Sequence, residues 1–180
     1  ALFQVYLVLT TLTVALLGLP APLFGQKPAR GVIKLWARAV LFGLTAICGI
    51  RYRIEGKENL PRSGAIVAAN HQSMWETIVF FTLLPNPVMV FKAELLRIPV
   101  YGWWGQRAGC IPIDRKAGVK SIRLMSRRAR EEVADNAQVI VFPEGTRTPV
   151  GAHSPLQPGV AAIYLAAEAA VTPAAHDSGR

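Results

Sequence analysis

The chain has 180 residues, a formal net charge of +9, 52% hydrophobic residues and a mean hydropathy of +0.32. This length suits a single domain with its own core. A chain this basic and this apolar is better suited to an anionic lipid surface than to nucleic acid, and it carries no recognition-helix or base-stacking motif. Two cysteines, Cys48 and Cys110, lie in apolar runs and are predicted to be small core residues, which argues against a disulfide framework.

The first fifty residues predict a pair of membrane-binding helices. Leu2–Leu19 carries no charge and as a helix would be about 27 Å long, close to the ~30 Å of a hydrocarbon core. A signal peptide or a buried helix would show the same pattern. The pattern also leaves open whether the helix spans the membrane or inserts into one leaflet. The second apolar segment, Gly31–Ile50, follows Lys27 and Arg30. It begins with Lys34 and Arg38 on one helical face and Trp36 between them. Cations and tryptophan beside an apolar helix are typical of an interfacial anchor.

From Arg51 the chain alternates short apolar runs with helix-like segments, which predicts an α/β domain with a mixed, largely parallel sheet flanked by helices. The predicted strands cover residues 51–56, 65–70, 87–92, 110–114, 138–142 and 171–175, and the longer predicted helices cover residues 75–84, 118–136 and 160–170. The organisation is therefore an anchoring helix pair in residues 1–50 and an α/β domain in residues 51–180. The sequence lacks an initiating methionine and stops soon after its last apolar run, so we expect that domain to be truncated at its carboxyl end.

The helix expected at residues 118–136 is amphipathic, because cations recur at spacings of four and three residues while apolar residues occupy a different face. The cations are Lys116, Lys120, Arg123, Arg127 and Arg130. They could attract anionic lipid headgroups or form an ordinary solvated face, and the pattern leaves both possibilities open.

The segment NHQSMWET places a histidine at the end of a predicted strand and a carboxylate five residues later. A neutral imidazole, with a pKa of about 6.5, suits removal of a hydroxyl proton, and a carboxylate on its other nitrogen fixes the tautomer. His71 and Glu76 can meet only if His71 lies in the turn before a helix and Glu76 in its first turn. Ser73 and Glu76 also fit the S-x-x-E capping box, in which Glu76 would only accept a backbone N–H.

A second charged turn, FPEGTR, follows the fifth predicted strand, and open α/β sheets bind ligands at the carboxyl ends of their strands. Gly145 would let backbone amides approach a ligand, Thr146 offers a hydroxyl, and Arg147 offers a planar fork suited to phosphate. An ion pair between Glu144 and Arg147 is the alternative. Another predicted strand end carries Arg115, so the three strand ends together suggest one phosphate-bearing substrate.

Four segments resemble, in order, the four sequence blocks of the glycerolipid acyltransferases. NHQSMWE resembles the N-H-x4-D block, GCIPIDR the second, FPEGTR the third and VTPAA the fourth. Within the family the chain is most similar to bacterial 1-acyl-sn-glycerol-3-phosphate (lysophosphatidate) acyltransferases, which share a segment like FKAELLRIPVYGW. The chain departs from the family pattern in having Glu76 where aspartate is usual, Thr148 where serine is common, and AAHDSG in place of a segment with asparagine before Ser-Gly.

The resemblance implies an enzyme of phospholipid biosynthesis on the cytoplasmic face of the bacterial inner membrane. It would move a fatty acyl group from acyl-CoA or acyl-acyl-carrier-protein to the sn-2 hydroxyl of lysophosphatidate, giving phosphatidate without a cofactor or a metal. The motifs do not separate this acceptor from another lysolipid such as lyso-ornithine lipid. A non-catalytic membrane-binding module is the alternative of a different class, although such a module has no need for a histidine base.

The resemblance also implies a role for each site residue. His71 would take the proton of the acceptor hydroxyl, with Glu76 orienting it, and the oxygen would attack the thioester without a covalent acyl-enzyme. Arg147, with Lys92 and Arg115, would hold the acceptor's phosphate, and Pro173 would help shape the site. The predicted site residues are His71 and Glu76 for catalysis, Lys92, Arg115, Glu144, Gly145, Thr146 and Arg147 for the acceptor, and Pro173 for the shape of the site.

Overall fold

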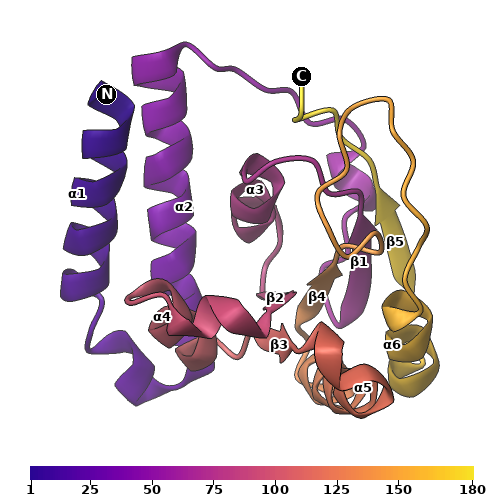
Figure 1. Cartoon of the computed structure of the whole chain (residues 1–180). Helices are drawn as coiled ribbons and strands as arrows, with labels where there is room; N and C mark the ends of the chain where they lie inside the picture. Colours follow the sequence, from indigo (N-terminus) through magenta and orange to yellow (C-terminus); the bar gives the residue numbers. More distant parts are fainter.

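A five-stranded parallel sheet forms the centre of the structure, a computed structural model that describes all 180 residues (Figure 1). The strands are β1 (Ala65–Ala69), β2 (Pro87–Lys92), β3 (Ile111–Ile113), β4 (Gln138–Val141) and β5 (Val171–Ala174). Their order in the sheet is β3-β2-β4-β1-β5, and each of the four pairings is parallel. The α/β prediction is confirmed, and the sheet is parallel throughout.

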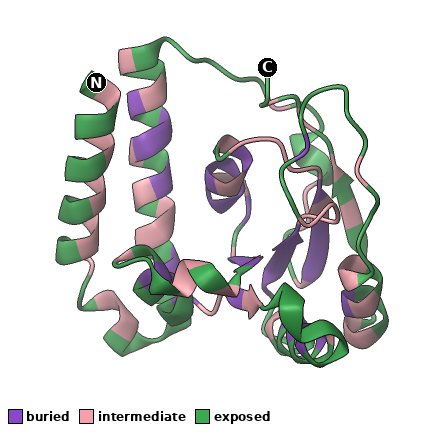
Figure 2. Ribbon diagram, in the orientation of Figure 1, coloured by how far each residue is buried: buried purple, intermediate pink, exposed green.

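Helices cover both faces of this sheet. The helices are α1 (Leu2–Leu17), α2 (Gln26–Cys48), α3 (Trp75–Leu83), α4 (Tyr101–Arg107), α5 (Gly118–Ala134) and α6 (Gly159–Ala167), with short 3-10 turns η1 (Ala21–Phe24), η2 (Lys57–Asn59), η3 (Ala93–Arg97) and η4 (Arg115–Ala117). Successive strand residues point to opposite faces, so Ile66 packs with α5 and α6 while Val67 packs with α2 and α3. The buried residues accordingly concentrate in the strands, in α3 and on the inner side of α2 (Figure 2).

The two N-terminal helices differ in how they pack. Helix α2 shares a core with β1 and α3 through Ala37, Val40 and Leu41, whereas α1 has no buried residue and lies along α2. The Tyr6 hydroxyl of α1 donates to the Ala39 carbonyl of α2 at 2.8 Å. Helix α2 is thus part of the α/β core, and a boundary between domains at residue 50 stays a prediction.

Four details of the sequence-based prediction are wrong. Residues 51–56 form no strand, because their charged side chains remain in solvent while the segment crosses the surface from α2 to η2. Cys48, at the end of α2, is exposed because the helix extends beyond the part that packs on the sheet. Arg30 is buried and forms an ion pair with Glu132, so it is not a surface cation, and the Trp36 indole faces α1, where it donates to the Thr11 hydroxyl at 2.9 Å.

Candidate active site

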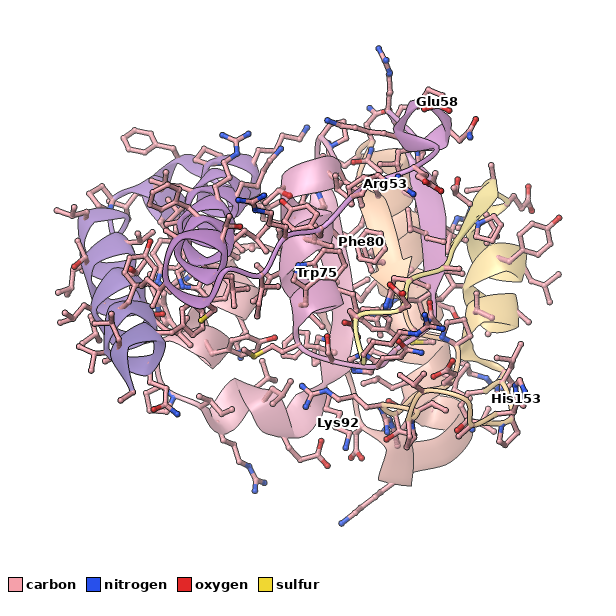
Figure 3. The ribbon with its side chains drawn as sticks, turned by 90° about the horizontal axis from the view of Figure 1, so that it is seen from above. Arg53, Glu58, Trp75, Phe80, Lys92 and His153 are labelled. Atoms are coloured by element: carbon pink, nitrogen blue, oxygen red, sulfur yellow. The ribbon has the colours of Figure 1, made fainter.

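The parallel sheet brings the predicted site residues to one edge. His71 follows β1, Lys92 ends β2, Arg115 follows β3 and Arg147 follows β4, and all parallel strands end at the same edge of a sheet. Figure 3 looks down on the structure from this side and labels Lys92. The residues therefore occupy the place where open α/β sheets bind their ligands.

His71 and Glu76 form a close pair at this edge. His71 lies in the turn after β1, and Glu76 lies in the first turn of α3, which is the arrangement that the sequence required. The distance from His71 Nδ1 to Glu76 Oε1 is 2.7 Å. The imidazole stacks on the Phe142 ring, with 4.3 Å between centroids, so its plane is held from the side as well.

The carboxylate of Glu76 is fully buried and surrounded by donors. Oε1 also accepts the N–H groups of Gln72 and Ser73 at 2.8 Å each, while Oε2 accepts the hydroxyls of Ser73 and Ser178 at 2.7 and 2.8 Å. Burial alone would raise the pKa of Glu76, but the hydrogen bonds from His71 and Ser73 outweigh it and hold that pKa well below its usual range. Because an ionised carboxylate can only accept, the contact with Glu76 fits the His71 tautomer in which Nδ1 donates and Nε2 is available as a base. Glu76 therefore makes the capping-box bond to Ser73 and the bond to His71 together.

The segment after β5 closes over this pair, and the sequence-based prediction missed its role. Asn70 and His176 are joined by three hydrogen bonds, of 2.9, 3.0 and 2.6 Å, and the Gly179 N–H donates to the Gln72 side chain at 3.2 Å. Ser178, the donor to Glu76, lies 3.1 Å from His176 Nδ1. The polar run HDSG directly after the last predicted strand was the only signal of this contact, since its partners lie more than a hundred residues away.

The FPEGTR turn folds against His71. The Thr148 N–H donates to the His71 carbonyl at 2.7 Å, and the His71 N–H donates to Glu144 Oε2 at 3.4 Å. Gly145 has a φ of +68°, which favours glycine, and a Cβ there would lie 3.8 Å from the Arg115 guanidinium carbon. The turn after β4, which carries Gly145, therefore lies against Arg115, which follows β3. The alternative ion pair between Glu144 and Arg147 is not formed.

The three predicted phosphate-binding cations, Lys92, Arg115 and Arg147, are exposed and form no ion pair. Burial and the neighbouring Cys110 raise the pKa of the Tyr101 hydroxyl at the start of α4, and the charge of Arg147 acts in the opposite direction. Thr146 is exposed beside Arg147. The cations are thus free to meet an anion.

Pro173 lies on β5, in register with Ala68 of β1, and is exposed. β5 is an edge strand, where proline is tolerated because one side of the strand needs no N–H donor. Pro173 lies one residue before the carboxyl end of β5, so it is at the same end of the parallel strands as His71.

The chain matches a known protein family over most of its length. A family model described as Acyltransferase matches residues 51–177. The chain belongs to the acyltransferase family. The acyltransferase match includes every predicted site residue from His71 to Pro173.

Two curated relatives carry the same activity in their names. The chain is 33% identical over 151 residues to the 1-acyl-sn-glycerol-3-phosphate acyltransferase of Pseudomonas aeruginosa, an alignment that covers 84% of this chain and 59% of that protein. It is 35% identical over 136 residues to the human 1-acyl-sn-glycerol-3-phosphate acyltransferase alpha, covering 74% of this chain and 47% of that protein. The acyltransferase chain thus spans about half the length of these two relatives.

The fold has a counterpart among solved structures. The crystal structure of the 1-acyl-sn-glycerophosphate (LPA) acyltransferase PlsC from Thermotoga maritima superposes with a TM-score of 0.64 at 23% sequence identity. The match covers 94% of this chain and 73% of that one, so it extends beyond the α/β domain into the N-terminal helical region.

Proposed function

We propose that the protein transfers a fatty acyl group from a thioester to the sn-2 hydroxyl of lysophosphatidate and so forms phosphatidate. The observation that carries this proposal is the 2.7 Å contact between His71 Nδ1 and Glu76, which leaves Nε2 available at the carboxyl ends of the strands, where three unpaired cations also lie. The names of the two curated relatives support lysophosphatidate as the acceptor.

The proposed reaction needs one base and no covalent enzyme intermediate. His71 Nε2 takes the proton of the acceptor hydroxyl as its oxygen attacks the thioester carbonyl, and Glu76 stabilises the imidazolium that forms. The tetrahedral intermediate then expels the thiolate, which receives the proton from His71. The products are an ester and a free thiol, so atoms and charge balance, and the chemistry uses no cofactor or metal beyond the acyl-CoA or acyl-carrier-protein co-substrate.

The acceptor's phosphate would bind to Arg147, Lys92 and Arg115 at the same edge. Arg147 offers the bidentate fork that matches phosphate oxygens, and the other two add charge from the ends of β2 and β3. Glu144, Gly145 and Thr146 would shape the turn that presents Arg147. A phosphate held there fixes the position of the attached glycerol hydroxyl relative to His71.

The exposed apolar surface of helix α1 supports a membrane location, and we propose the cytoplasmic face because the thioester donors occur there. Its 16 residues are about 24 Å long, short of a ~30 Å hydrocarbon core, and large apolar side chains such as Leu2, Leu9 and Leu16 are 59 to 70% exposed. Helix α2 alone is long and apolar enough to cross a membrane, with a mean hydropathy of 1.6, but it packs on the sheet. We therefore place α1 in one leaflet, as the anchor of the α/β core.

Flotation on liposomes tests the anchor. Leu9→Gln with Leu12→Gln removes apolar surface from α1 without touching the core, so it should reduce the floated fraction severalfold. The matched control, Leu156→Gln with Leu165→Gln, changes leucines that are 71 and 72% exposed elsewhere and should float normally. Equal flotation of all three proteins would exclude α1 as the anchor.

The acceptor is tested by a panel assay with membranes that contain the protein. Lysophosphatidate, lyso-ornithine lipid and lysophosphatidylcholine are offered with acyl-CoA and with acyl-carrier-protein donors. We expect phosphatidate to be the main product. A preference for lyso-ornithine lipid, or no product from lysophosphatidate with either donor, would contradict the proposed acceptor.

A further inference from the structure

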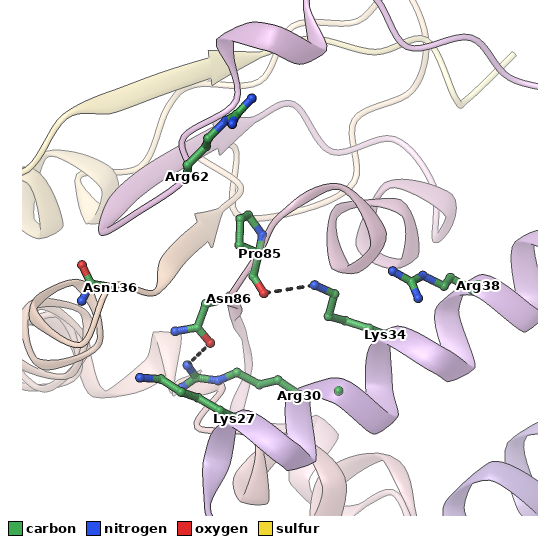
Figure 4. A pocket seen from close by; sticks show the side chains of 9 residues that line it. Lys27, Arg30, Lys34, Arg38, Arg62, Pro85, Asn86 and Asn136 are labelled. Atoms are coloured by element: carbon green, nitrogen blue, oxygen red, sulfur yellow. Dashed lines mark hydrogen bonds between the residues drawn. The ribbon is translucent and has the colours of Figure 1, made fainter.

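A pocket of about 520 Å³ lies beside α2 (Figure 4). Its lining comes from α2 and from the loops that precede β1, β2 and β4, which contribute Arg62, Asn86 and Asn136. Those loops lead into the amino ends of the parallel strands, whereas the candidate active site lies at the carboxyl ends. The pocket is therefore a separate site.

The lining holds five cations and no carboxylate. Two of the cations are neutralised from outside the pocket, Lys27 by Asp135 at 3.1 Å and Arg30 by Glu132 at 2.5 Å. The other three, which are Lys34, Arg38 and Arg62, take part in none of the ion pairs of the structure. The pocket thus keeps three positive charges without a protein counter-charge.

Lys34 is fixed close to other positive charges of the pocket, which repel its own. Its ammonium group donates to the carbonyls of Leu84 and Pro85 at 3.0 Å each, which fixes it at the pocket wall. Burial and the neighbouring charge of Arg38 lower the pKa of Lys34. An anion in the pocket would oppose this lowering of the Lys34 pKa, because it supplies the missing counter-charge and favours the protonated form.

The same helix indicates what kind of anion fits. Gly31, Leu35, Arg38 and Phe42 recur at spacings of four, three and four and form the exposed stripe of α2. Leu35 is 58% exposed and Phe42 is 70% exposed, so Arg38 stands between two apolar side chains that lie mostly in solvent. A basic pocket that borders exposed apolar surface matches a molecule with a phosphate and a hydrocarbon part. We propose that this pocket binds the phosphate of an anionic phospholipid headgroup, with Leu35 and Phe42 against the lipid beyond it.

The test removes two of the unpaired charges and compares the variant with a matched control. Arg38→Gln with Arg62→Gln changes two exposed side chains at the pocket, and Lys120→Gln with Arg123→Gln removes the same net charge from the exposed face of α5. Each protein is floated on vesicles of phosphatidylcholine with and without phosphatidylglycerol. A cation near an anionic surface contributes about 1 kcal/mol, so the pocket variant should lose about 25-fold in affinity for the anionic vesicles. The α5 control should keep most of its affinity, and both should keep the parent's thermal midpoint.

Two outcomes would overturn the proposal. Equal losses in both double variants would show that binding depends on overall charge and not on the pocket. The second outcome combines two results: inorganic phosphate raises the thermal midpoint of the parent but not of the pocket variant, and the parent shows no preference for anionic vesicles. These results together would assign the pocket to a free anion. Flotation is measured without catalysis, so neither outcome depends on the proposed acyl transfer.

Discussion

Replacing Glu76 by glutamine separates its two roles, because the structure shows where the new amide must sit. Oε1 is surrounded by three N–H donors, from His71, Gln72 and Ser73, so the amide oxygen has to take that position. The amide NH2 then replaces Oε2, where the hydroxyls of Ser73 and Ser178 can turn and accept. Shape and hydrogen bonding are kept, and we expect a loss of stability of no more than about 1 kcal/mol, the size of a lost cap.

The effect on turnover should be much larger. A neutral amide cannot stabilise the imidazolium of His71, and loss of general-base catalysis lowers rates by about 10²–10⁴-fold. That range corresponds to about 3–5 kcal/mol of activation free energy, since each tenfold is about 1.4 kcal/mol. The acceptor's KM should change little, because the cations at the strand ends are untouched. Glu76→Gln should therefore behave as a turnover variant with a nearly normal thermal midpoint.

The assay measures kcat at saturating acceptor and thermal unfolding for Glu76→Gln, His71→Ala and the double variant. The double variant should be little slower than either single one, because paired groups act as a unit. Glu58→Gln, an exposed carboxylate in η2, is the matched control and should be normal. A Glu76→Gln protein with near-normal turnover would refute the orienting role and leave Glu76 as a helix cap.

Three further changes test other parts of the structure. Arg147→Lys keeps the charge but loses the fork, so the KM for lysophosphatidate should rise about tenfold, and an unchanged KM would remove Arg147 from the phosphate site. Ser178→Ala removes a hydrogen-bond donor to the ionised Glu76 carboxylate, a bond of about 1.5–3 kcal/mol. We therefore expect kcat to fall about tenfold at constant KM and to recover in Ser178→Thr. A change in KM alone would argue against a positioning role for Ser178. Glu132→Gln leaves Arg30, which is 1% exposed, without its counter-charge and should lower the free energy of unfolding by about 3–5 kcal/mol. Asp135→Asn, at the exposed pair with Lys27, should change it little. Equal thermal midpoints of the two variants would contradict this prediction.

The sheet was predictable because its strands are short, apolar and bounded by turns. The observed β2 matches its predicted bounds, and β4 and β5 end one residue before theirs. Residues 51–56 failed because an alternation of charged and apolar residues describes an extended surface segment as well as a strand. Sequence periodicity indicates the conformation of a segment, but it does not indicate whether a neighbouring strand is available to pair with it.

The site was predictable only where its residues are close in the sequence. The spacing of five between His71 and Glu76, with a helix start between them, was enough to predict their contact. The hydroxyl donor from Ser178, and the His176–Asn70 bonds that fix its segment, could not be inferred, because this segment reaches the pair only through the parallel addition of β5 beside β1. The burial of Arg30 was missed for the same reason, since its partner Glu132 lies 102 residues further along the chain.

The most direct test of the proposed function is the formation of phosphatidate by His71→Ala. Membranes containing the parent protein, His71→Ala or His153→Ala are supplied with lysophosphatidate and a labelled acyl thioester, and labelled phosphatidate is measured. His153 is an exposed loop histidine and serves as the matched control. We expect phosphatidate from the parent and from His153→Ala, and a loss of at least about 10²-fold with His71→Ala. Phosphatidate formed by His71→Ala at the parent's rate would contradict the account.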